Sequence, residues 1–98
     1  MSLQVYSKES CKYCVMAKDF LNANHIPYDE IKMEPDSDSY GTERQALIDR
    51  TAGHTTFPWI FVEDDFIGGY KELLLSYNTT QLHQKLKSIG ITIEEPDF

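Results

Sequence analysis

The sequence predicts an α/β protein with a four-stranded mixed sheet flanked by helices on both faces, in the order β-α-β-α-β-β-α. Its beginning has a strand-helix-strand pattern, which requires a right-handed crossover between parallel strands. A later hairpin pattern adds antiparallel strands, and the helical segments between and after the strands cover the sheet. The 98 residues suit one domain spanning 1–98, in which about 91–98 form an acidic tail.

The first half of the chain supplies two strands and a helix. Residues 3–7 alternate apolar and polar side chains and are rich in strand formers, so they predict the first strand. Residues 12–24 carry an apolar stripe of helical spacing that ends before Pro27, because the residue preceding a proline disfavours helical geometry. Residues 28–33 predict a second strand, although acidic side chains interrupt it.

A second helix and a hairpin follow. The helix is expected to start near Thr42, with Asp38 or Ser39 as its cap, and to stop at Gly53. The hairpin comprises a buried run from Trp59 to Val62, an acidic turn at Asp64 and Asp65, a return at Phe66 and Ile67, and a double glycine.

The last part of the chain predicts one or two helices. The segment between the double glycine and Gly90 has a helical pattern, and Asn78 or Thr79 could cap a second helix within it. Gly90 is expected to end the pattern.

Charge and composition restrict the kinds of partner. The formal net charge of −7 argues against nucleic-acid binding and against attachment to an anionic membrane. The chain shows neither a signal-peptide pattern nor an apolar run long enough to span a bilayer. We therefore expect a cytoplasmic protein, monomeric, whose partners are proteins or small molecules.

The two cysteines, Cys11 and Cys14, could serve three purposes. A structural zinc site would need two further ligands, but His25, His54 and His83 are isolated in the sequence. A structural disulfide over so short a loop would remove little entropy from the unfolded chain, and a reducing compartment would oppose it. The third alternative is thiol-disulfide exchange.

The position of the pair favours exchange. Cys11 precedes the predicted helix, where unpaired backbone N–H groups and the helix dipole favour a thiolate, and Lys8 and Lys12 add positive charge. Cys14 lies one turn later on the apolar stripe, so it is expected to be sheltered. An exposed, activated thiol with a sheltered partner within bonding distance is what two-step exchange requires.

Three segments in register carry a resemblance to a known family. "CKYC" is similar to CPYC, with Lys12 in place of proline; "TFPWIFV" is similar to a Thr-Val-Pro strand element; and "FIGGYKEL" is similar to IGG-x-D-x-L, with Lys71 in place of an acidic residue. Together they resemble the dithiol glutaredoxins, which have the thioredoxin-like fold. The resemblance covers nearly the whole chain and leaves only the tail outside.

The resemblance implies a glutathione-dependent oxidoreductase. Cys11 would be the nucleophile and Cys14 the resolving thiol. Glutathione would be the reductant, with no permanently bound cofactor and no metal. The substrates would be disulfide-bonded or glutathionylated proteins, with ribonucleotide reductase as a candidate client. The residues implied to bind glutathione or substrate are Lys8, Tyr13, Thr56, Phe57, Pro58, Gly68, Gly69 and Tyr70.

Individual roles follow from the same resemblance. Pro58 would be cis and would place the Phe57 backbone beside Cys11, whereas the residues alone fit a trans proline equally well. The amides of the double glycine would bind the γ-glutamyl carboxylate, although a turn alone also explains these glycines. Arg50 and His54 could meet the glycine carboxylate of glutathione.

Lys71 is the departure that bears most on function. A lysine there would repel the γ-glutamyl ammonium and weaken glutathione binding unless Glu72 supplies the missing charge. A first rival is therefore a redoxin recharged by thioredoxin reductase. A second is a module that holds an iron-sulfur cluster through Cys11 and glutathione, and a third is a catalytically idle interaction domain, which an ordinary Cys11 thiol would support.

Overall fold

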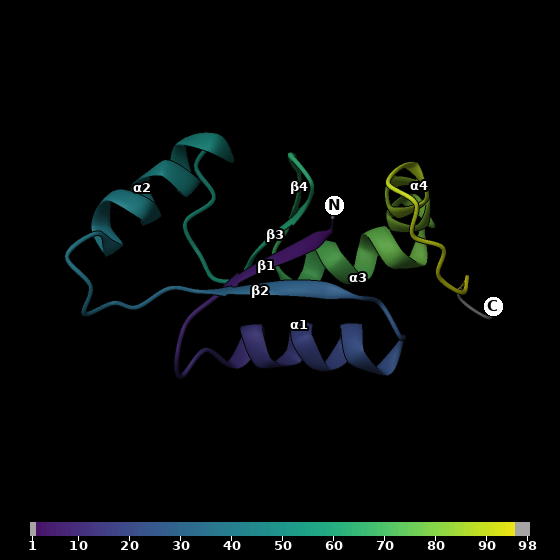
Figure 1. The fold of residues 1–98 in the computed structure, drawn as a ribbon, viewed down its shortest axis with the longest axis horizontal. Helices are drawn as coiled ribbons and strands as arrows, with labels where there is room; N and C mark the ends of the chain where they lie inside the picture. The colour runs from purple at the N-terminus through teal and green to yellow at the C-terminus, as the bar shows by residue number, and fades with distance from the viewer. Residues whose placement is uncertain (1, 96–98) are drawn as a thin grey trace.

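The computed structural model describes residues 2–95, within which the chain forms four strands and four helices (Figure 1). The sheet order is β2-β1-β3-β4, with β1 and β2 parallel and the other neighbouring pairs antiparallel, so the mixed sheet is confirmed. In chain order the elements are β1 (Leu3–Ser7), α1 (Lys12–Ala23), β2 (Tyr28–Lys32), α2 (Tyr40–Arg50), β3 (Trp59–Val62), β4 (Asp65–Gly68), α3 (Tyr70–Asn78) and α4 (Gln81–Ser88).

The sheet separates two groups of buried apolar side chains. Leu3 and Val5 of β1 pack with α1, α3 and α4 on one face. Trp59 and Phe61 of β3 pack on the other face, where Leu47 of α2 covers them. Figure 1 shows α1 and α2 on opposite sides of the sheet, which confirms the expectation of helices on both faces.

The burial of each strand explains why β3 has a continuous apolar sequence and β2 does not. All four residues of β3 are buried, since this strand lies inside the sheet with helices on both sides. β2 is an edge strand, and its last four residues are exposed, which allows the acidic side chains that weakened its pattern. An edge strand with charged side chains also resists pairing with other chains.

The start of α2 differs from the prediction. The helix begins at Tyr40 rather than near Thr42, because the Ser39 hydroxyl bonds the Glu43 carboxylate and the Ser39 carbonyl accepts the Glu43 N–H. Its end agrees with the prediction, since Gly53 has a φ of +94° and donates its N–H to the Ile48 carbonyl.

The C-terminal segment forms two helices, and the predicted cap between them was wrong. Thr79 ends α3, because its hydroxyl donates to the Leu75 carbonyl 2.9 Å away. Thr80, with a φ of +61°, precedes α4, and its side chain makes no capping hydrogen bond. The hairpin turn also lies one residue earlier than predicted, at Glu63 and Asp64. Of the expected tail, 91–95 has no helix or strand and 96–98 lies outside the described residues.

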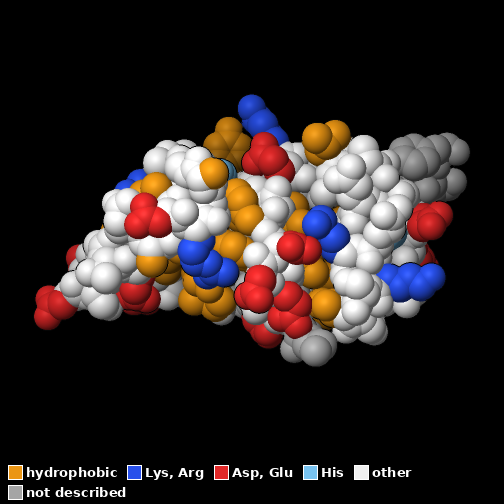
Figure 2. Space-filling model, turned by 90° about the horizontal axis from the view of Figure 1, so that it is seen from above, with side chains coloured by type: hydrophobic (Ala, Val, Ile, Leu, Met, Phe, Trp, Pro, Cys, Tyr) orange, Lys and Arg blue, Asp and Glu red, His pale blue; other side chains and the backbone are white. Residues whose placement is uncertain are grey.

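One face of the molecule remains partly open beside α2. Figure 2 looks onto this side and shows hydrophobic side chains gathered next to α2, with acidic and basic side chains around them. Tyr6, Met33, Ala46 and Leu47 line a cavity of about 230 Å³ there together with charged side chains. Within residues 2–95, no helix has the length and apolar character needed to cross a membrane.

Candidate active site

The two cysteines form a disulfide at the start of α1. Their Cα atoms lie 5.2 Å apart, within the usual range for a disulfide. Cys11 is the N-cap residue of α1, and its sulfur accepts the Cys14 backbone N–H at 3.2 Å. Cys14 is only 1 % exposed and packs on the same helix face as the buried Ala17, whereas Cys11 is partly accessible. The predicted difference between an accessible and a sheltered sulfur is therefore present.

Lysines surround the accessible sulfur. Cys11 lines a depression of about 370 Å³, which we call the lysine pocket and define by its lining residues. Lys8 lies in this pocket, and its ammonium is 5.0 Å from the centre of the Phe57 ring, a cation–π contact. The lining residues are Lys8, Glu9, Ser10, Cys11, Lys12, Val15, Lys18 and Lys32.

The segment before β3 has the geometry that the resemblance implied. The Phe57–Pro58 peptide bond is cis, as expected, and Pro58 is buried. The next residue, Trp59, is fully buried and donates its indole N–H to the Thr51 hydroxyl at 3.3 Å. This anchor fixes the backbone that presents Phe57 between the lysine pocket and a second hollow.

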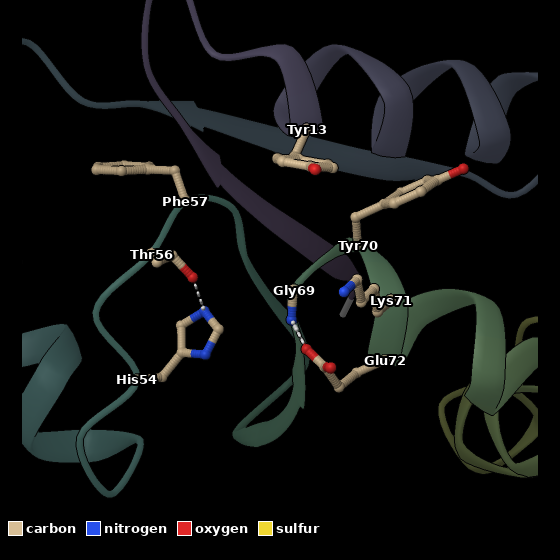
Figure 3. A pocket seen from close by; sticks show the side chains of 8 residues that line it. All are labelled: Tyr13, His54, Thr56, Phe57, Gly69, Tyr70, Lys71 and Glu72. Carbon is tan, nitrogen blue, oxygen red and sulfur yellow. Dashed lines mark hydrogen bonds between the residues drawn. The ribbon is translucent and has the colours of Figure 1, made fainter.

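The second hollow, which we call the aromatic groove, has a volume of about 440 Å³. Figure 3 shows it between the 54–57 loop and the N-terminus of α3, with the rings of Tyr13 and Tyr70 on one side. These two rings lie 6.2 Å apart. The groove is lined by Tyr13, His54, Thr56, Phe57, Gly69, Tyr70, Lys71 and Glu72.

Most of the predicted binding residues are thus brought together, but not all of them in one hollow. Tyr13, Thr56, Phe57, Gly69 and Tyr70 all line the aromatic groove. The remaining three do not line it: Pro58 and Gly68 are buried, and Lys8 lies in the lysine pocket with Cys11.

One of the backbone N–H groups expected to bind glutathione already has a hydrogen-bond acceptor in Glu72. Its Oε1 accepts the Gly69 backbone N–H at 2.8 Å, which Figure 3 shows as a dashed line across the groove floor. This contact is one half of a capping box at the start of α3, and glycine has no side chain to supply the other half. Gly68 has a φ of +132°, and a Cβ there would overlap the Glu72 side chain, so glycine is required at this position.

Of the two side chains predicted to meet the glycine carboxylate of glutathione, only His54 lies in the aromatic groove. His54 lines the aromatic groove and lies 3.4 Å from the Thr56 hydroxyl (Figure 3). Arg50 lies 4.6 Å above the ring of Phe61 and borders the cavity beside α2, so it is outside the groove. Sequence reasoning missed Arg44, which donates to the Thr55 carbonyl at 2.9 Å and holds the loop; its chain position gave no signal of that contact.

Two of the lysines that line the lysine pocket belong to ion pairs. Lys18 and the Ser7 hydroxyl both donate to one oxygen of Glu30, and these hydrogen bonds lower the pKa of the Glu30 carboxyl. Lys32 pairs with Glu9, which raises the pKa of Lys32 and lowers that of Glu9 through the hydrogen bond and charge attraction.

Histidines, cysteines and acidic side chains do not form a metal-binding group of three or more among residues 2–95. His25, His54 and His83 lie in a turn, a loop and a helix. His83 packs against Tyr77 and bonds the Glu94 carbonyl, at the opposite end of the chain from the cysteines.

Comparison with known proteins gives a consistent result. The Glutaredoxin family model matches residues 3–67. Glutaredoxin-2, mitochondrial, of Bos taurus is 34% identical over 87 residues, covering 89% of this chain and 50% of that protein. Glutaredoxin 3 of Escherichia coli is 33% identical over 72 residues, covering 74% of this chain and 81% of that protein. The chain spans about half the length of the mitochondrial relatives it matches.

A solved structure extends the likeness to the fold. The buckwheat glutaredoxin-glutathione complex aligns with a TM-score of 0.81 and 25% identity, covering 93% of this chain and 81% of that one. The family model, over residues 3–67, covers β1 to β3, the cysteine pair, the cis proline segment and β4 except Gly68. The chain therefore belongs to the glutaredoxin family and has its thioredoxin-like fold.

Proposed function

We propose that this protein is a dithiol thiol-disulfide oxidoreductase that uses glutathione as its reductant. One observation carries the proposal: Cys11 is accessible at the N-terminus of α1, and Cys14 is buried behind it at disulfide distance. Membership of the glutaredoxin family supports it.

The reaction has two exchange steps. The Cys11 thiolate attacks one sulfur of a substrate disulfide, so that a new S–S bond forms and the other sulfur leaves with the electron pair and takes a proton. The Cys14 thiolate then attacks the Cys11 sulfur, which forms the Cys11–Cys14 disulfide and releases the substrate as a thiol. Two glutathione molecules reduce this disulfide and leave joined as glutathione disulfide. Where Cys11 carries glutathione itself, one glutathione thiolate attacks the mixed disulfide, restores the Cys11 thiolate and leaves as glutathione disulfide. The backbone N–H of Cys14 contacts the Cys11 sulfur, and together with the helix dipole it stabilises the thiolate in the reduced protein.

The aromatic groove is the place for glutathione. The first amides of α3, at Tyr70 and Lys71, have no helical acceptor and suit the γ-glutamyl carboxylate, since the Gly69 amide is bonded to Glu72. The Glu72 carboxylate suits the ammonium of the same γ-glutamyl group and offsets Lys71. His54 and Thr56 on the opposite side suit the glycine carboxylate. The buckwheat neighbour was solved as a glutathione complex, which supports the proposal that this chain binds glutathione.

The proposal extends to the protein's substrates and to the compartment in which it works. Glutathionylated and disulfide-bonded proteins are the proposed substrates, and ribonucleotide reductase is one candidate among them. We propose that the protein works as a monomer in a reducing compartment, the cytoplasm.

One observation favours a second candidate function. Lys71 lines the aromatic groove, where its charge opposes an ammonium, so a redoxin recharged by thioredoxin reductase would tolerate it better. Glu72, in the same groove, favours glutathione.

Turnover with each reductant tests the proposal. We expect a small mixed disulfide to be reduced when glutathione and glutathione reductase regenerate the protein. Turnover only with thioredoxin reductase would favour the second candidate. Absence of turnover with both would favour the cluster-binding or idle-domain alternatives, which an iron-sulfur absorption spectrum after anaerobic purification would separate.

A further inference from the structure

The lysine pocket borders the reactive sulfur and is positively charged. Four lysines and one glutamate line it, a formal excess of three positive charges, although the chain as a whole carries −7. Glu30 lies outside the lining but bonds Lys18, which reduces the local excess to two. An acidic partner is therefore repelled by most of the chain and attracted at Cys11.

Two of the lysines are available to a partner without breaking an ion pair. Lys12 is exposed at the first turn of α1, and Lys8 lies over the Phe57 ring; neither belongs to an ion pair within residues 2–95. Lys32 pairs with Glu9, but the side chains are 46% and 69% exposed, so water competes with the pair and it contributes little stability. Lys32 can therefore exchange Glu9 for a carboxylate of a partner.

The elements place these charges on one side of the sulfur. Lys32 ends β2 directly beside Ser7 of β1, just before the loop that leads to Cys11 (Figure 1). On α1, Lys12 and Val15 are three residues apart and share a face, whereas Tyr13 faces the aromatic groove. Val15 is 51% exposed and adds an apolar contact within the charged rim.

We propose that the lysine pocket binds acidic side chains that flank the cysteine of a protein substrate, while the aromatic groove binds the glutathione half of the same mixed disulfide. The inference rests on the proposed function and names its preferred substrate class, glutathionylated acidic protein segments. In the first step, Cys11 bonds the glutathione sulfur, the substrate S–S bond breaks, and the substrate sulfur leaves as a thiolate that takes a proton. Glutathione, the proposed reductant, then regenerates Cys11 and leaves as its disulfide.

The test uses two glutathionylated peptides of equal length, one with aspartates on both sides of its cysteine and one with asparagines. The full chain is assayed for kcat/KM on each, at low and at moderate salt. We expect a preference for the aspartate peptide of about tenfold at low salt, shrinking as salt screens the charges. Equal kcat/KM for both peptides would overturn the inference and leave the proposed function intact.

Two variants and a control locate the effect. Lys32→Gln and Lys12→Gln should each lower the preference for the aspartate peptide about threefold. In the Lys32→Gln variant, kcat/KM for the asparagine peptide should change little. Lys87→Gln, which removes an exposed lysine of α4, should leave the preference unchanged. Equal slowing of both peptides by Lys12→Gln and Lys32→Gln would assign the lysines to the thiolate or to glutathione and overturn the inference. Failure of the natural chain to reduce either peptide would overturn the proposed function as well.

Discussion

Replacing Glu72 with alanine or with glutamine separates two effects of one carboxylate. Its Oε1 accepts the Gly69 N–H at 2.8 Å and caps α3, and in our proposal its charge also holds the ammonium of glutathione. Alanine removes the acceptor and the charge, whereas glutamine keeps an acceptor oxygen and removes only the charge.

The expected effect on stability follows from the cap. Loss of a capping hydrogen bond at an exposed helix end costs about 1 kcal/mol, so Glu72→Ala should lower Tm by about 4–8 °C in a chain of this length. Glu72→Gln keeps a neutral acceptor and loses the charge at the helix N-terminus, which costs about 0.5 kcal/mol. Thermal unfolding followed by circular dichroism measures both.

The expected effect on glutathione follows from the charge. An ammonium and a carboxylate about 4 Å apart attract by about 1 kcal/mol in water and more at a partly shielded surface. Glu72 is exposed, so the lower value applies and KM for glutathione should rise about fivefold in both variants. A Glu72→Gln protein with an unchanged KM would refute the assignment of Glu72 to the ammonium, whatever its Tm.

Three further changes test other parts of the account. Lys71→Asp should lower KM for glutathione about tenfold in the coupled reductase assay, because a repelling charge becomes an attracting one; an unchanged KM would place the ammonium elsewhere. Gly68→Ala should destabilise the fold by about 1–3 kcal/mol in urea unfolding, since alanine at a φ of +132° is strained and its Cβ overlaps Glu72; wild-type stability would contradict that geometry. The lowered pKa of Glu30 stabilises the fold above its unfolded-state pKa, and this contribution is lost as pH falls through the folded-state pKa, in the acid range below the usual carboxyl value of 4.5. Ser7→Ala removes one cause of the shift, so its free energy of unfolding should fall less over this range than that of the natural chain; an equal fall would exclude the Ser7 hydrogen bond as a cause.

Most of the fold was predictable because local patterns and burial agree. The alternation in residues 3–7 matches a strand whose Leu3, Val5 and Ser7 are buried. The break between α3 and α4 was harder to place, since it depends on Thr79 bonding back to α3 and on Thr80 adopting a left-handed conformation. A threonine fits either the end of one helix or the start of the next, and only the backbone geometry decides which of the two positions it takes.

The parts of the site that depend on a local backbone motif were predictable from the sequence. The parts that depend on contacts between side chains distant in the sequence were less predictable. The cysteine spacing was enough to place one sulfur at the N-cap and one in the core. The sequence could not separate His54, which reaches the groove, from Arg50, which turns away to the ring of Phe61. The sequence also did not reveal the lysine pocket, because Lys32 is distant from Cys11 in the chain and approaches it only through pairing of β1 and β2.

The most direct test of the central claim is to identify the sulfur that carries glutathione. Cys14→Ser and Cys11→Ser proteins would each be reduced, treated with a glutathionylated peptide, and analysed as intact proteins by mass spectrometry. We predict that Cys14→Ser gains one glutathione, held as a mixed disulfide on Cys11, and continues to turn over with glutathione, whereas Cys11→Ser gains none and is inactive. Glutathione on Cys14 of the Cys11→Ser protein, with turnover retained, would contradict the assignment of Cys11 as the nucleophile.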